Sequence, residues 1–133
     1  MAVVIRHIDK IARDKQDGVL YVVFEGEKFR GKFEKFEERI GLIKLLEKHK
    51  IIYEKCAEFA NENGWRSYKG QLYIDLAFDK TNEKYMVLEN YLEYEDGTPK
   101  MEGVMFYYLP LEIAMQNAHH DELGFWEKWA EEF

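Results

Sequence analysis

The sequence predicts an α+β fold, a ferredoxin-like βαββαβ sandwich with an extra N-terminal helix and C-terminal helices. Two uncharged apolar runs, Val19–Phe24 and Val104–Leu109, are typical of strands buried on both faces. Stretches with helical spacing alternate with strand-like stretches along the rest of the chain. The 133 residues, of which 47% are hydrophobic, fit a single domain over 1–133 with a core of its own.

A helix over about residues 4–15 is expected first. Its apolar residues share one helical face: Val4, Ile5, Ile8, Ile11 and Ala12. Gly18 is expected to take the left-handed conformation that ends many helices. The strand 19–25 follows, and because it carries no charge between residues 19 and 24 we place it at the centre of the sheet.

A longer amphipathic helix is expected from Phe33 to about residue 50. Its apolar residues are spaced by three or four: Phe33, Phe36, Ile40, Ile43 and Leu46. Residues 51–56 either extend this helix or form a strand. The β-branched start that follows a basic helix end favours the strand, as in a βαβ crossover.

The second half repeats this order. Residues 72–78 alternate and predict a strand, although Asp75 is unusual in the middle of a sheet. Residues 81–94 are expected to form a helix, with a strand over 85–94 as the alternative. The uncharged run 104–109 predicts another inner strand. Pro110 ends this strand and opens a short helix, and Asp121 is expected to cap a final helix over 121–133.

The net charge of −7 is unevenly distributed, because segments 89–102 and 121–133 each carry a net charge of −4. Nucleic acids and anionic membranes bind to basic patches, so the composition argues against both as partners. No apolar run approaches the roughly 20 residues that span a bilayer, and no signal peptide is visible. With Cys56 as the single cysteine, a cytoplasmic location is expected.

Common catalytic motifs are absent from the sequence. There is no glycine-rich phosphate loop, and Ser67, the single serine, lacks the Gly-x-Ser-x-Gly context of hydrolases. Cys56 is interpreted as a small buried hydrophobic residue rather than a nucleophile. No catalytic residue is nominated, and whether the protein is an enzyme stays open.

One polar cluster has metal-ligand side chains. His119, His120 and Glu122 are candidate ligands of a divalent metal, completed by at least one further ligand. Three acids could supply that further ligand: Asp75, Asp79 and Glu112. The alternative is a junction between helices in which Asp121 is a cap and the histidines are hydrogen-bonded.

Two further sets are candidate binding residues. Trp65, Arg66 and Tyr68 lie in the long connection 57–71, and aromatic residues beside a guanidinium commonly recognise carboxylates, phosphates or proteins. The alternative is that the aromatic rings fold down over the edge of the core. Trp129 lies on a flank of the final helix and is a candidate dimer contact.

We therefore expect a protein that works by binding, either through self-association as a homodimer or through a protein partner. The alternative is a small-molecule or metal-dependent enzyme that uses the cluster 119–122. A metal retained by the purified protein would favour the enzyme over the binding protein.

Overall fold

The computed structural model describes residues 6–57 and 68–121, which form a mixed α+β fold around a four-stranded antiparallel sheet. The strands are β1 (Val19–Phe24), β2 (Ile52–Lys55), β3 (Leu72–Asp75) and β4 (Val104–Leu109). The helices are α1 (Ile8–Lys15), α2 (Glu37–Lys48), α3 (Glu83–Leu92) and α4 (Leu111–Ala114). Two 3₁₀ segments, η1 (Phe33–Lys35) and η2 (Met115–Asp121), flank α2 and α4. No helix within this part of the chain is long and apolar enough to cross a membrane.

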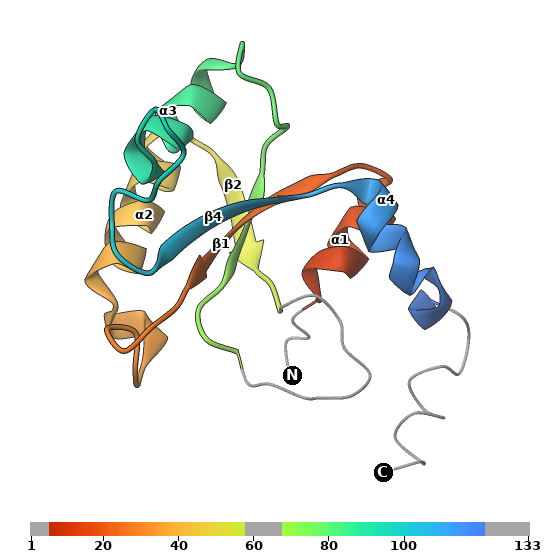
Figure 1. Cartoon of the computed structure of the whole chain (residues 1–133), viewed down its shortest axis with the longest axis horizontal. Helices are drawn as coiled ribbons and strands as arrows, with labels where there is room; N and C mark the ends of the chain where they lie inside the picture. Colours follow the sequence, from red (N-terminus) through yellow and green to blue (C-terminus); the bar gives the residue numbers. More distant parts are fainter. Residues whose placement is uncertain (1–5, 58–67, 122–133) are drawn as a thin grey trace.

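The sheet has the strand order β2-β3-β1-β4 and is covered on both faces. Figure 1 shows α2 and α3 on one side of the sheet and α1 and α4 on the other. The segments β1-α2-β2 and β3-α3-β4 therefore place their helices on the same face. The helices near the two ends of the described chain, α1 and α4, make the third layer.

Strand β1 is apolar at every position because it contributes to two cores. Leu20, Val22 and Phe24 pack in the core beneath α2 and α3, whereas Val19 packs in a smaller core beneath α1 and α4. Successive side chains of a strand point to opposite faces, so a strand covered on both faces needs apolar residues throughout. The prediction of a central strand at 19–24 is confirmed.

The larger core joins the sheet to α2 and α3, and the smaller core joins it to α1 and α4. The fully buried side chains of the larger core include Leu20, Val22, Leu42, Leu46, Leu72, Ile74, Leu88 and Leu92. Those of the smaller core include Ile8, Ile11, Ala12, Val19, Cys56 and Ala114.

The prediction that residues 104–109 form an inner strand is wrong, because β4 lies at one end of the sheet. Its partner is β1, with Val19 opposite Leu109 and Phe24 opposite Val104. An uncharged run indicates that the faces of a strand are covered, but it carries no information about the two edges.

Gly18 has a different role from the one predicted. The left-handed residue at the end of α1 is Gln16, with φ 57°. Gly18 instead allows the Tyr108 ring to approach the backbone, because a Cβ at Gly18 would lie 2.1 Å from the Tyr108 hydroxyl oxygen. The position therefore needs glycine for space.

The other differences concern where elements begin and end. The helix predicted from Phe33 begins at Glu37, after η1, and β3 ends at Asp75, which explains an acid at that position. The preferred readings of 51–56 as strand and of 81–94 as helix are confirmed by β2 and α3. The predicted final helix beyond Asp121 lies outside the described residues.

We predict that Leu20→Ala lowers the free energy of unfolding by about 2–5 kcal/mol, because it leaves a cavity in the larger core beside β1. Ile52→Ala is the control, since Ile52 is 68% exposed and its truncation is expected to cost under about 0.5 kcal/mol. Urea denaturation measures both values. Equal losses in the two variants would contradict a core centred on β1.

Candidate functional site

The structure describes only some of the predicted site residues. Tyr68 and His119 fall within the described ranges. The side chain of His120 and the whole of Trp65, Arg66, Glu122 and Trp129 lie outside them. Neither set lies wholly within the described residues, so the proposed roles of these residues stay predictions.

Tyr68 is anchored to the body of the domain. Its hydroxyl donates to the carbonyl oxygen of Gln71 at 2.7 Å and accepts from the Arg39 guanidinium at 3.3 Å. Its ring meets that of Phe33 edge-on, with the ring centroids 4.8 Å apart. Lys55 lies over the same two rings. These contacts agree with the alternative in which this aromatic ring folds down on the core edge.

The described residues hold no group of three His, Cys, Asp or Glu side chains that would bind a metal ion. His119 is exposed at the end of η2. The neighbouring Asp121 carboxylate is already held by two cations, Arg13 at 2.8 Å and Lys10 at 3.2 Å. This acid is therefore used to fasten η2 to α1.

Arg13 is the centre of that junction. Its side chain is buried, and it donates to the Asp9 carboxylate at 2.7 Å, to both Asp121 oxygens and to the carbonyl oxygen of Ala114. The Asn117 amide also donates to Asp9. A buried guanidinium that loses its partners strongly destabilises the folded protein. The network therefore holds α4 and η2 against α1.

A second polar group lies where α1 meets β3. The Lys15 ammonium donates to the Tyr73 hydroxyl at 2.7 Å and to the Asp75 carboxylate, to which Tyr73 also donates. The Lys15 hydrogen bond lowers the pKa of Asp75, but burial raises the pKa of Tyr73. Because the phenol is not activated as an acid or base near neutrality, the group serves to attach α1 to the sheet.

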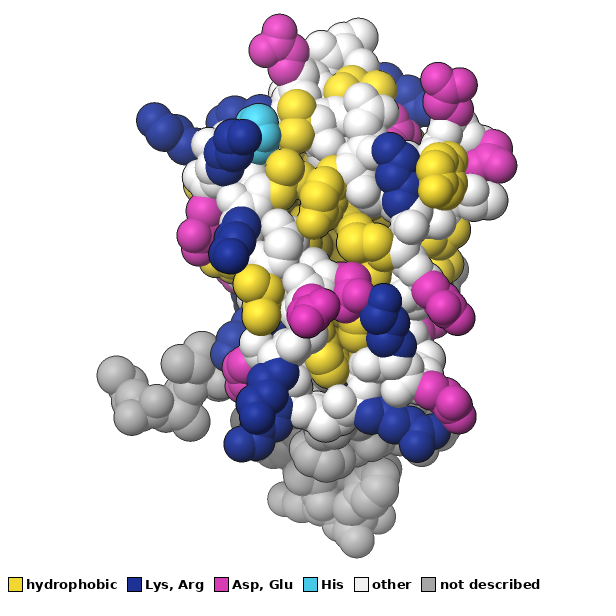
Figure 2. Space-filling model, turned by 90° about the vertical axis from the view of Figure 1, so that its left-hand side faces the viewer, with side chains coloured by type: hydrophobic (Ala, Val, Ile, Leu, Met, Phe, Trp, Pro, Cys, Tyr) yellow, Lys and Arg dark blue, Asp and Glu magenta, His cyan; other side chains and the backbone are white. Residues whose placement is uncertain are grey.

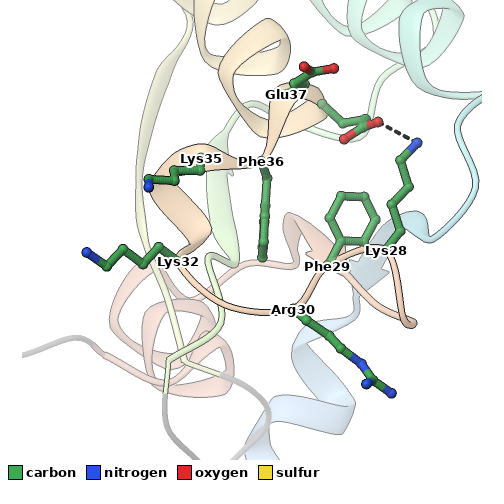
Figure 3. A pocket seen from close by; sticks show the side chains of 8 residues that line it. Lys28, Phe29, Arg30, Lys32, Lys35, Phe36 and Glu37 are labelled. Carbon is green, nitrogen blue, oxygen red and sulfur yellow. Dashed lines mark ion pairs between the residues drawn. The ribbon is translucent and has the colours of Figure 1, made fainter.

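A shallow hollow of about 360 Å³ lies before α2, lined by Lys28, Phe29, Arg30, Lys32, Lys35, Phe36, Glu37 and Glu38. Figure 3 shows that Lys32 and Lys35 point to one side and Arg30 to the other. Lys28 is paired with Glu38 at 2.5 Å. A ligand site needs polar groups that converge on one position, and these cations do not converge, so the hollow is a weak candidate.

An apolar strip on the outer face of α2 and α3 is another candidate site. Figure 2 shows hydrophobic side chains along the middle of the outer face of the α2 and α3 layer, with charged side chains around them. Ile40 of α2 is exposed, and Tyr91 of α3 is half-buried beside Gly41. Single exposed apolar residues on a helix are normal, so this strip is not by itself evidence of a site.

The strongest candidate is the outer edge of β4. All six residues of this strand are uncharged, and Tyr107 and Tyr108 are 37% and 42% exposed. In the described part of the chain no strand pairs with this side of β4. A long uncharged edge of this kind can accept another strand.

The direction of the backbone groups of β4 follows from its register. The Glu25 amide donates to the carbonyl oxygen of Gly103 at 2.8 Å, in register with the β1–β4 pairs. Hydrogen-bonded and non-hydrogen-bonded pairs alternate along an antiparallel ladder. Residues 105, 107 and 109 therefore bond to β1, whereas Phe106 and Tyr108 direct their amides and carbonyls outward.

Side chains on both faces of β4 add aromatic surface to this edge. On the α3 side, the Tyr108 ring packs on that of Phe78, with centroids 4.9 Å apart, and Phe78 is 50% exposed. On the opposite face the Tyr107 ring lies 5.4 Å from that of Tyr21. An added strand would be flanked by aromatic rings above and below.

Strand β2, at the other end of the sheet, is protected in ways that β4 is not. It has four residues, two of them the charged Glu54 and Lys55. Just beyond it, the backbone of Ala57 exchanges hydrogen bonds with Arg6 and Ile8. Short length, charge and a covering segment are the usual means of blocking an edge.

Residues 104–109 are predicted as a strand from the sequence, but the outer edge of this strand is not predicted as a site. The available signal was the absence of charge over six residues, which fits either an inner strand or an unprotected outer one. Comparisons with protein-family models, with curated proteins and with solved structures gave no match.

We predict that Asp121→Asn weakens the junction between η2 and α1 and lowers the stability by roughly 1–2 kcal/mol at neutral pH. The Arg13 hydrogen bonds lower the pKa of Asp121 in the folded protein. Its contribution is therefore complete above the ordinary carboxyl pKa and is lost as the pH falls through the folded-state pKa.

Urea denaturation from pH 7 to pH 2.5 measures this dependence. The difference between wild type and Asp121→Asn should shrink in acid, whereas Asp14→Asn, which removes exposed ion pairs to Lys10 and Arg6, should change little at any pH. A constant difference at all pH values would argue against an ionised Asp121 at the junction.

Proposed function

We propose that this protein works by binding another protein chain, with the outer edge of β4 as the contact. The observation that carries the proposal is the contrast between the two ends of one sheet. β2 is short, charged and partly covered, whereas β4 presents six uncharged residues and outward backbone groups at Phe106 and Tyr108. Strand addition to such an edge supplies main-chain hydrogen bonds for affinity and side-chain contacts for selectivity.

The ion pairs around α1 support a binding role over a catalytic one. Arg13 and Lys15 each hold carboxylates that attach α1 to its neighbours, and none of these groups lines the hollow before α2. Burial raises the pKa of the Cys56 thiol to about 12, which disfavours the thiolate that a nucleophile needs.

We further propose a ferredoxin-like arrangement for the fold. The element order β1-α2-β2-β3-α3-β4 supports it, as does the insertion of β3 between β1 and β2, which makes these two strands parallel to each other. The fold alone does not identify a partner. The buried, unpaired cysteine supports a reducing compartment such as the cytoplasm.

The test compares two charge insertions at the two sheet edges. Tyr107→Lys places a charge on the β4 edge and Ile52→Lys places the same charge on the β2 edge. Association, whether with itself or with a chain from an extract of the source cells, should weaken about tenfold or more in the first variant and persist in the second.

Size-exclusion chromatography with mass identification measures association, and circular dichroism confirms that both variants are folded. The proposal fails if the two variants associate equally, or if the wild type binds neither itself nor any other chain.

A further inference from the structure

We propose that the strand received by β4 is the β4 strand of a second copy of this chain, which gives a twofold dimer with a continuous eight-stranded sheet. This inference rests on the proposed function and adds the identity of the partner. A twofold contact is self-complementary, so each outward group of one strand meets its counterpart in the other.

The backbone of β4 allows antiparallel self-pairing only about twofold axes that pass at a residue. Phe106 and Tyr108 direct their amides and carbonyls outward, so the twofold axis must pass at a residue that keeps these groups opposite one another. Centres at Phe106 and at Tyr107 pair five of the six strand residues with β4 of the second copy, whereas centres at Met105 and at Tyr108 pair only three. A centre between two neighbouring residues would set outward groups against inward ones.

The centre at Tyr107 makes better use of the side chains. It sets Tyr107 against Tyr107 of the second copy, and sets Tyr108 against Phe106 in both directions, which makes three aromatic pairs. The centre at Phe106 makes one aromatic pair, because Tyr107 then faces a methionine and Tyr108 a valine. Cross-strand aromatic pairs stabilise a sheet, so the register centred on Tyr107 is the one we assign.

This register also fits the hydrogen bonds already present. Phe106 of each copy pairs with Tyr108 of the other copy. Each of these two pairs exchanges two amide–carbonyl hydrogen bonds, which makes four bonds between the copies. The Val104 amide, which already donates to Met101 at 3.1 Å, is not needed. Pro110, which has no amide, lies outside the bonded pairs.

Electrostatics favour the strand itself as its partner. The chain carries a net charge of −7, which opposes contact between two copies wherever acids would meet. All six residues of β4 are uncharged, so this edge brings two copies together without burying a charge. A charged strand from another protein would place its charge beside the aromatic rings of Tyr107, Tyr108 and Phe78. That charge would be unfavourable there, because β4 has no opposite charge to pair with it.

Hydrogen exchange of the wild-type protein tests the inference without a mutation. The Phe106 and Tyr108 amides should exchange quickly in dilute protein and slowly at high concentration, because pairing protects them. The matched controls are the Tyr53 and Lys55 amides, which the β2–β3 register directs outward at the other edge. These two should exchange at a rate that does not depend on protein concentration.

A cysteine variant tests the register. Tyr107→Cys should form an intermolecular disulfide on mild oxidation, because residues in a non-hydrogen-bonded pair on the axis approach closely. The native Cys56 is buried and stays unreactive. Ile52→Cys is the control for random collision, since it is more exposed and lies on the other edge.

The outcomes separate this inference from the proposed function. Concentration-dependent protection at Phe106 and Tyr108, with faster cross-linking at residue 107 than at residue 52, supports the dimer. A protein that stays monomeric, with equal cross-linking at both positions, overturns the dimer. In that case a cellular partner lost on Tyr107→Lys would still support the proposed function. A dimer that leaves the two β4 amides unprotected overturns this inference, and the proposed function fails as well if no cellular partner is lost on Tyr107→Lys.

Discussion

The burial of β1 on both faces is the constraint on which the rest of the structure depends. Leu20 and Val22 require cover from α2 and α3, whereas Val19 requires cover from the opposite side. The crossover helices α2 and α3 both lie on one face. The other face is therefore covered by helices from outside the βαββαβ core, which are α1 and α4.

That requirement explains where the buried charge lies. Among the described side chains of α4 and of the 3₁₀ segment η2, only Ala114 and the polar Asn117 are buried. Arg13 supplies the missing attachment by binding Ala114 and Asp121, which lie 101 and 108 residues further along the chain. The layer that covers β1 from this side is thus held by a polar network as well as by a core. Within the described residues, no strand pairs with the outer side of β4.

The sequence predicted those features that depend on local periodicity. Apolar spacing predicted α2 and α3, and the absence of charge predicted that β1 is central. The edge position of β4 was not predictable, because Val104–Leu109 and Val19–Phe24 are both uncharged in sequence, whereas β1 has two neighbouring strands and β4 has one among the described residues. The pairing of Arg13 with Asp121 has no local signal either. Tyr68 was predicted to be a binding residue because it is close to Trp65 and Arg66 in the sequence. In the structure, its contacts are instead with Arg39, Phe33 and Gln71.

The central claim is that two copies of the β4 edge pair about Tyr107. The most direct measurement is an isotope-filtered nuclear Overhauser experiment on a mixture of ¹³C-labelled and unlabelled chains, which detects only contacts between chains. The account predicts a strong contact between the two Tyr107 Hα atoms, because the Cα atoms of a non-hydrogen-bonded antiparallel pair lie about 4.5 Å apart. Intermolecular contacts from the outer faces of α2 and α3, with none from β4, would contradict it.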